Sequence, residues 1–260
     1  MIQHRVFIRG ADFLFAINGR KGRKMNTHTP LSTKREKTQR LVVSAMMLAI
    51  ATVLALICAY IPFLNFPFGG GFTIASMLPI ILVSYMYGVK WGLFTGGIYS
   101  VIQMLLGHGT IVAMFLPNDD AYQGVFRALV ICLMDYFAAY TVIGLGGIFR
   151  KRIKNHTAAL CLGAVVALLL RYLIHIVSGT IFYGAFAEWF FTDTVFADMA
   201  FSTWIMENMS GGLLATVYSV IYNGCYMIPE IIITALAAVP VARIPFVKNK
   251  VDKILTEREN

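Results

Sequence analysis

The sequence predicts an all-α integral membrane protein with six transmembrane helices and both termini in the cytoplasm. Hydrophobic residues make up 58% of the chain and charged residues only 13%, whereas average globular chains are roughly 25% charged. The apolar residues form runs of about 20, which is the length that crosses roughly 30 Å of hydrocarbon. Basic and acidic residues alternate between the connections, and this alternation orients the helices.

The first part of the chain, residues 1–40, is polar and basic and is a predicted disordered cytoplasmic segment. Its short apolar patch at 13–17 is too brief for the core of a signal peptide. Met25 opens a stretch that is typical of a polar leader. We therefore expect Met25 to be the native start, with residues 1–24 either an upstream misannotation or a disordered extension.

Six apolar segments follow and form the predicted transmembrane domain, residues 41–240. The second segment is short and contains Pro79, and the fifth is long enough to bend or tilt. The predicted spans are 41–62, 72–88, 90–107, 123–149, 157–187 and 210–240. A polar cytoplasmic tail is expected at 241–260.

Lys and Arg gather in every second connection. They occupy the N-terminus, Lys90, the 150–154 turn and the tail, while acids occupy the alternate connections. The acids are Asp119, Asp120, Glu188, Asp193, Asp198 and Glu207. Because cytoplasmic loops carry an excess of Lys and Arg, six spans place every basic cluster inside. Membrane orientation therefore explains the net charge of +9 better than binding to nucleic acid does.

Small residues recur every four positions in two of the predicted helices. Gly88, Gly92 and Gly96 would let another backbone approach closely, and ordinary packing within the chain is the simpler interpretation. A second stripe is formed by Ala45 and Ala49, and a third follows at Ala51 and Ala55.

Several chemistries are not supported by the sequence. It contains no G-x-x-x-x-G-K-[ST] phosphate loop, no H-E-x-x-H and no G-x-S-x-G. The histidines are scattered without ligand spacing, and the isolated cysteines lie inside apolar runs, so neither a metal nor a cofactor is expected. The halves also show no clear inverted repeat of the kind common in secondary transporters.

Polar side chains inside the predicted helices carry the functional signal. A charge at a helix centre costs about 2.5–3.5 kcal/mol on insertion scales, so such residues default to functional hypotheses. Those in the last three spans are Arg127, Asp135, Arg171, His175, Tyr218, Asn223 and Glu230.

The estimated depths of several of these side chains coincide. Counted from the outer end of its span at about 1.5 Å per residue, Asp135 lies roughly 18 Å deep, near the midplane. Arg171 and His175 are four residues apart and share a helix face. We expect one layer to contain Asp135, His175, Tyr183, Tyr218 and Asn223. Two simpler interpretations stay open: an ion pair between Asp135 and Arg171, and a His175 that only bonds a neighbouring helix.

Four stretches resemble the thiamine-specific S components, the substrate-binding subunits of energy-coupling factor (ECF) transporters. They are SMLPIILVSYMYGVKWGLFTGGIYSVIQMLLG (76–107), LMDYFAAYTVIGLGGIF (133–149), RYLIHIVSGTIFYG (171–184) and YSVIYNGCYMIPEIIITA (218–235). The most specific pieces are R-Y-L-x-H-x-x-S-G and Y-N-G-x-Y-M-x-P-E. The resemblance covers about residues 41–240, which it implies to be a six-helix substrate-binding domain.

The resemblance also implies the ligand-binding positions. The acidic ligand falls on Asp135, where glutamate is expected, and the stacking aromatic on Tyr183, where tryptophan is expected. Gly179 implies close backbone approach. The implied set is Asp135, Tyr136, His175, Gly179, Tyr183, Tyr218 and Asn223. In the first loop, Phe66 and Phe68 are candidates for an aromatic that closes the pocket.

The partners follow from the same resemblance. Such subunits capture a vitamin from outside with high affinity, and a transmembrane T component with two cytoplasmic ATPases drives its release inward. Ala45 and Ala49 would form the docking face for the T component. The expected protein is therefore a thiamine-binding transporter subunit of the bacterial plasma membrane and not an enzyme. Its partners would be thiamine, the T component, the ATPases and the lipid bilayer.

The residue types suit this ligand. Thiamine has a cationic thiazolium ring and an aminopyrimidine with donors and acceptors. A buried carboxylate can balance the charge or accept the amino hydrogens, and aromatic faces stacked on a cation add about 0.5–2 kcal/mol each. The alternatives are an S component for another small aromatic nutrient, such as hydroxymethylpyrimidine or riboflavin, and an autonomous small transporter or intramembrane enzyme.

Overall fold

The computed structural model describes residues 30–65 and 71–259 of the chain. The expectations for residues 1–29, including Met25 as the native start, and those for Phe66 and Phe68 lie outside the described residues. The chain divides into two compact units, residues 1–39 and 40–260. In the first unit the structure describes only the opening of a helix, and the fold below is that of the second.

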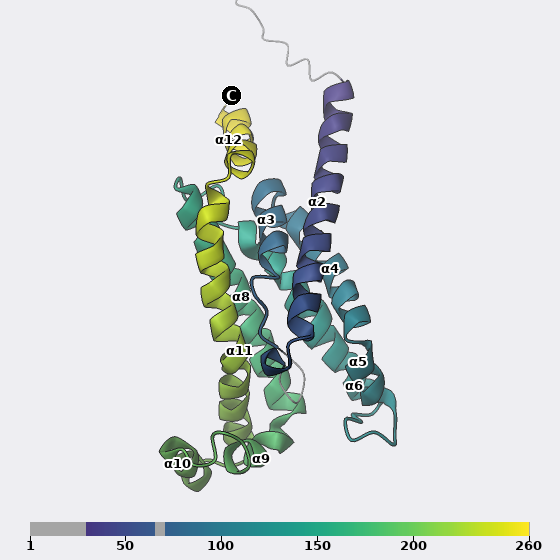
Figure 1. The fold of residues 1–260 in the computed structure, drawn as a ribbon, viewed down its shortest axis with the longest axis vertical. Coiled ribbons are helices and arrows are strands. Elements are labelled where there is room, and N and C mark those ends of the chain that lie inside the picture. Colours follow the sequence, from purple (N-terminus) through teal and green to yellow (C-terminus); the bar gives the residue numbers. More distant parts are fainter. Residues whose placement is uncertain (1–29, 66–70, 260) are drawn as a thin grey trace, which may run out of the picture. The chain divides into compact units, whose positions relative to one another are not determined.

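The described part is built from helices (Figure 1), with an isolated bridge between Asn65 and Gly71. Its longest helices are α2 (Pro30–Ala59), α8 (His156–Phe182) and α11 (Gly211–Ala242). A fourth long helical stretch, Val125–Gly147, joins α6 (Val125–Ile131), η2 (Cys132–Ala138), α7 (Ala139–Thr141) and η3 (Val142–Gly147). These four are long and apolar enough to cross a membrane. Because α2 begins at Pro30, residues 30–40 are helical and not disordered as predicted.

A fifth crossing requires two helices together. α4 (Val89–Leu106) and α5 (His108–Phe115) are bent by 72° at Gly107, and the two helices taken as one span are long and apolar enough to cross a membrane. The predicted third span is thus continued by a helix in what was expected to be an irregular connection at 108–122.

The second predicted span, 72–88, differs most from expectation. Only α3 (Leu78–Tyr87) is helical there, and its ten residues rise about 15 Å, half of the hydrocarbon thickness. Every residue from Leu78 to Met86 is buried. The apolar run that predicted a membrane-spanning helix therefore belongs to the protein core, where a short helix is sufficient. The high hydropathy of a segment does not distinguish the two environments.

Close packing around α3 uses the predicted glycine stripe. Gly88 turns the chain from α3 into α4 with a φ of 104°, which favours glycine. A Cβ on Gly92 would lie 2.6 Å from the carbonyl oxygen of Gly144. Ser84 occupies the same contact and donates its hydroxyl to that oxygen at 2.5 Å. The glycines thus pack helices within the chain, as the simpler interpretation held.

Shorter helices cover the two ends of the bundle (Figure 1). At one end lie η4 (Gly184–Phe186), α9 (Ala187–Thr192) and α10 (Ala200–Asn208), in a region where the sequence predicted a connection and the end of the fifth span. At the other end lies α12 (Pro245–Glu259), in the predicted polar tail. α12 buries Val247 and Val251, so this tail is a packed helix.

A chain of hydrogen bonds also holds α12. The Tyr85 hydroxyl lies 2.9 Å from Nδ1 of His156, and Nε2 of His156 lies 2.9 Å from the Asp252 carboxylate. α3, the start of α8 and α12 are thereby joined at one end of the bundle.

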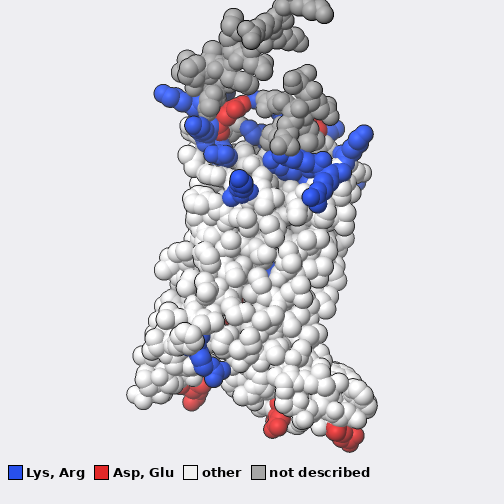
Figure 2. All heavy atoms as spheres, turned by 180° about the vertical axis from the view of Figure 1, so that it is seen from behind, with Lys and Arg blue, Asp and Glu red and all other residues white. Residues whose placement is uncertain are grey.

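Charge separates along the second unit. Figure 2 shows most Lys and Arg side chains at one end, with some acidic side chains beside them, further Asp and Glu side chains at the opposite end and largely uncharged surface between the two ends. Exposed apolar side chains on the intervening helices include Leu173 at 54% and Leu236 at 65% exposure. This pattern matches the alternation of basic and acidic connections in the sequence.

Candidate functional site

A cavity of about 120 Å³ lies between η2, α8 and α11. All seven predicted binding residues line it: Asp135, Tyr136, His175, Gly179, Tyr183, Tyr218 and Asn223. They come from three segments that are far apart in sequence, which the fold brings to one layer. The side chains that were predicted from helix depths to share one layer therefore line a single cavity.

The segment that carries Asp135 and Tyr136 is a π-helix, Cys132–Ala138, inside the longer helical stretch. A π-turn inserts extra residues into a regular helix and is frequent at functional sites. Here it sets the direction in which Asp135 and Tyr136 leave the helix, and both side chains line the cavity.

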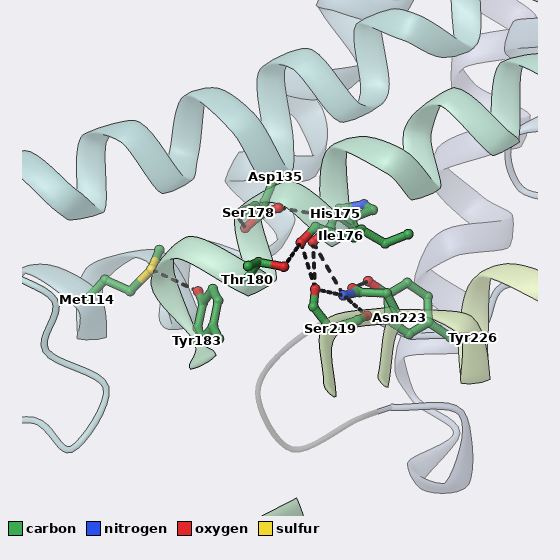
Figure 3. Close-up of polar contacts among 10 residues, drawn as sticks. All are labelled: Met114, Asp135, His175, Ile176, Ser178, Thr180, Tyr183, Ser219, Asn223 and Tyr226. Atoms are coloured by element: carbon green, nitrogen blue, oxygen red, sulfur yellow. Dashed lines mark hydrogen bonds and ion pairs between the residues drawn. The ribbon is translucent and has the colours of Figure 1, made fainter. Parts of the chain in front are cut away.

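Asp135 bonds to α8 through both of its oxygens (Figure 3). Its Oδ1 lies 3.0 Å from Nδ1 of His175, and its Oδ2 accepts a hydrogen bond of 2.7 Å from the Ser178 hydroxyl. The partner of Asp135 is thus His175 and not Arg171, so the interpretation of Asp135 and Arg171 as an ion pair is wrong.

Arg171 also lines the cavity and is only 5% exposed. Its guanidinium carbon lies 4.4 Å from the ring centre of Tyr140, and one terminal nitrogen lies 2.8 Å from the Met77 sulfur. Its Nε has no hydrogen-bond partner within the described part of the chain. Glu230 is near enough to interact with this guanidinium electrostatically.

Asn223 is held by its own helix and by α8 (Figure 3). Its Nδ2 donates to the Ser219 carbonyl at 2.8 Å, and its Oδ1 accepts a hydrogen bond from the Tyr226 hydroxyl. The amide nitrogen also lies 3.4 Å from the carbonyl oxygen of His175. Asn223 therefore fixes α11 against α8 with its donors, although its side chain lines the cavity.

Gly179 allows this close contact between α8 and α11. A Cβ on Gly179 would lie 2.2 Å from the Ser219 hydroxyl oxygen and 3.2 Å from the Asn223 amide nitrogen. The close approach that the resemblance implied at this glycine is made by side chains of α11. A larger residue here would require Ser219 or the helix that carries it to shift.

Aromatic rings form the rest of the wall. Tyr183 lies at the end of α8, where its hydroxyl points to the Met114 sulfur at 3.8 Å. Tyr218 is 1% exposed, and its ring centre lies 5.3 Å from that of Phe190 on α9. Tyr140, Tyr222 and Tyr226 also line the cavity and were not singled out from the sequence. Tyr218, Tyr222 and Tyr226 follow one another at intervals of four residues and therefore share one face of the helix. This spacing is the signal in the sequence that could have predicted Tyr222 and Tyr226 as lining residues.

Two members of the intramembrane polar set lie elsewhere. Arg127 is exposed and donates to the carbonyl oxygen of Phe182 at 3.0 Å. Glu230 is 1% exposed and accepts from the backbone N–H of Thr73 at 2.8 Å and from its hydroxyl at 2.5 Å. Neither residue lines the cavity.

The two alanine stripes of α2 differ in environment. Ala45 and Ala49 are exposed, whereas Ala51 is fully buried and Ala55 is 8% exposed. The second stripe packs within the protein. The first is open to another molecule.

A larger cavity of about 670 Å³ adjoins the first. Tyr136, Tyr140, Arg171 and Tyr183 line both spaces. The larger cavity extends past the end of α2 to the acidic connection that contains Asp119 and Asp120. The smaller cavity thus opens toward the acidic end of the bundle.

Comparisons with known proteins agree on one family. The sequence model described as "Thiamine transporter protein" matches residues 41–197. The thiamine transporter ThiT of Bacillus subtilis (strain 168) is 31% identical over 206 residues, covering 76% of this chain and 86% of that protein. A solved structure of ThiT from Listeria monocytogenes superposes with a TM-score of 0.55 at 18% identity, covering 82% of this chain and 98% of that one.

The structural likeness supports the helical fold, and the family model and the sequence identity support the relationship. The families and relatives found are transporters, so the chain is a membrane transport protein and not an enzyme. The chain belongs to the thiamine transporter protein family.

Proposed function

We propose that this protein captures thiamine from outside the cell as the S component of an ECF-type importer in the bacterial plasma membrane. A T component and two ATPases would then drive release inward. In this proposal the chain crosses the membrane six times, with α3 as a short buried segment and both termini cytoplasmic. The observation that carries the proposal is the cavity, in which an acid, an imidazole and several aromatic rings meet inside an apolar bundle.

The walls of the cavity support a cationic ring as ligand. Asp135 places a carboxyl group in the cavity, where its Oδ2 accepts a hydrogen bond from the Ser178 hydroxyl. Aromatic side chains surround it, among them Tyr136, Tyr183 and Tyr218. Aromatic faces attract cations, so this lining suits the thiazolium ring of thiamine.

The shape of the site supports a flat ligand with two ends. Ligand pockets usually occupy about 300–1,000 Å³, so the 120 Å³ cavity alone is small. A bound vitamin would place one ring there and extend past Tyr136, Tyr183 and Arg171 into the larger space. The aromatic side chains at this boundary are suited to stacking on both rings.

Coupling to a partner rests on different residues. Ala45 and Ala49 lie one turn apart on the exposed face of α2, where small side chains permit close helix contact. We propose this face as the docking surface for the T component.

Purified full-length protein tests the ligand. Native mass spectrometry should detect thiamine carried through purification, and calorimetric titration should show saturable binding of thiamine in preference to hydroxymethylpyrimidine and riboflavin. Tighter binding of either competitor would reassign the substrate. Uptake into cells or vesicles that lack the T component and ATPases would instead indicate an autonomous transporter.

A further inference from the structure

The geometry points to Asp135 as the residue that holds the ring proton of His175 on Nδ1, so that His175 offers its Nε2 lone pair to an N–H donor of the ligand. This inference rests on the proposed function, because it assigns the amino group of the aminopyrimidine as that donor. It makes Asp135 a positioning residue and His175 the group that selects for an amino substituent.

The first step concerns the shared hydrogen bond. An ionised carboxylate only accepts hydrogen bonds. Oδ2 of Asp135 already accepts from the Ser178 hydroxyl, and Oδ1 lies 3.0 Å from Nδ1 of His175. With the carboxylate accepting at both oxygens, we place the ring proton on Nδ1. In a neutral imidazole the other nitrogen is then an acceptor.

The second step concerns Nε2. This atom is buried and has no hydrogen-bond partner among residues 30–65 and 71–259. A doubly protonated ring would place an N–H there without an acceptor, and the cation of Arg171 is near enough to act on the ring. A neutral ring with a free lone pair avoids the second positive charge. The lone pair is left for a molecule that enters the cavity, which His175 lines.

The third step excludes the neighbouring side chains of α11 as donors. The amide nitrogen of Asn223 donates to Ser219, and the Tyr226 hydroxyl donates to Oδ1 of Asn223. The Ser219 hydroxyl lies 2.8 Å from the carbonyl oxygen of Ile176, to which it donates. These polar groups are committed to hydrogen bonds within α11 and from α11 to α8. An amino group on a ligand ring is a donor that could satisfy Nε2.

Nitrogen NMR of the full chain, labelled with ¹⁵N-histidine and purified in nanodiscs without ligand, tests the tautomer. His175→Gln identifies the signal. We expect the wild-type Nε2 shift to be that of an unprotonated ring nitrogen and Nδ1 that of a protonated one. A protonated Nε2 would overturn the inference, and this arm does not depend on thiamine binding.

A pair of ligands tests the selection. Oxythiamine carries a ring carbonyl where thiamine carries the amino group, so its oxygen would meet the Nε2 lone pair. We expect wild-type protein to prefer thiamine by about tenfold to a hundredfold, the range for an unsatisfied buried polar group. Asp135→Asn, whose amide can accept from or donate to Nδ1, should shrink this ratio.

Ser178→Ala is the matched control, because it removes the other hydrogen bond of the same carboxylate and keeps the one to His175. The thiamine to oxythiamine ratio should stay as in wild type even if both affinities fall. Equal ratios in wild type, Asp135→Asn and Ser178→Ala would overturn the inference. If neither ligand binds the folded wild-type protein, the proposed function fails and the NMR result still decides the tautomer.

Discussion

At the scale of single residues, binding chemistry depends on which hydrogen-bonding groups remain free after folding. Both oxygens of Asp135 and the amide of Asn223 are already engaged within the protein. Asp135 therefore contributes its charge and the orientation of His175, and Asn223 contributes the spacing of two helices. The aromatic rings remain the principal contact surfaces of the cavity.

Asp135→Asn should weaken thiamine binding by about 1.5–3 kcal/mol, or one to two decades in affinity, because it removes a charged hydrogen-bond partner. Calorimetric titration measures this loss, and a melting curve on the same sample shows whether the variant is folded. Unchanged affinity in a well-folded variant would contradict the site assignment. A purely structural role would instead lower the melting temperature with and without ligand alike.

Tyr183 offers a test of stacking that leaves the charges in place. Tyr183→Ala should weaken thiamine binding by about 0.5–2 kcal/mol through the loss of an aromatic face. Tyr183→Trp should bind as tightly as wild type or more tightly, because the larger ring keeps that face. Equal affinities for the Ala and Trp variants would show that this ring does not touch the ligand.

At the scale of helices, α2 and α11 have separate roles. α2 presents Ala45 and Ala49 outward. α11 reaches back through Glu230 to Thr73, in the segment that leads into α3. A carboxylate buried among donors is stable only while they remain in place, so this contact ties the 71–77 segment to the bundle.

Replacing both Ala45 and Ala49 by Trp should abolish thiamine uptake while the isolated subunit still binds thiamine. The bulky rings would block close approach of a partner helix. Leu173→Trp, at another exposed position, is the matched control and should retain uptake. Surviving uptake in the double variant would place the docking face elsewhere.

Glu230→Ala should lower the free energy of unfolding by about 1–3 kcal/mol, because the buried donors of Thr73 lose their acceptor. Thermal melts of this variant, of Thr73→Val and of the double variant measure their coupling. A coupling of at least about 0.5 kcal/mol is expected for residues in direct contact. Strict additivity would argue against the bond.

At the scale of the whole molecule, orientation depends on the separation of charge between the two ends of the second unit (Figure 2). Basic residues are retained on the cytoplasmic side during insertion. The acidic end is also the end toward which the cavities open, past Asp119 and Asp120. An outward-facing site for a cation follows if this end is external.

Cysteine labelling tests this orientation. In a protein whose native cysteines are replaced, single cysteines at Asn118 and Asp193 should react with a membrane-impermeant reagent on intact cells. A cysteine at Lys154 is the control and should react only after lysis. Protection of either outer position would overturn the orientation.

The hydropathy, the charge and the residue spacing of short stretches of sequence suffice to predict the membrane class, the charge alternation and the layer of polar side chains. A run of about 20 apolar residues and a constant helical rise do not depend on what lies beside them. The five side chains placed in one layer from helix depths, Asp135, His175, Tyr183, Tyr218 and Asn223, line one cavity for this reason. Tyr136 and Gly179 line it too, but they were predicted only from the family resemblance.

Packing between helices decided the features that cannot be predicted from short stretches of sequence. α3 is as apolar as a spanning helix, yet its surroundings are protein, so it needs only ten residues. His175 and not Arg171 became the partner of Asp135, and the donors of Asn223 turned toward α8. The physical reason is that a hydrogen bond requires the partner's distance and direction, which depend on how neighbouring helices are rotated and how closely glycines such as Gly179 let them approach.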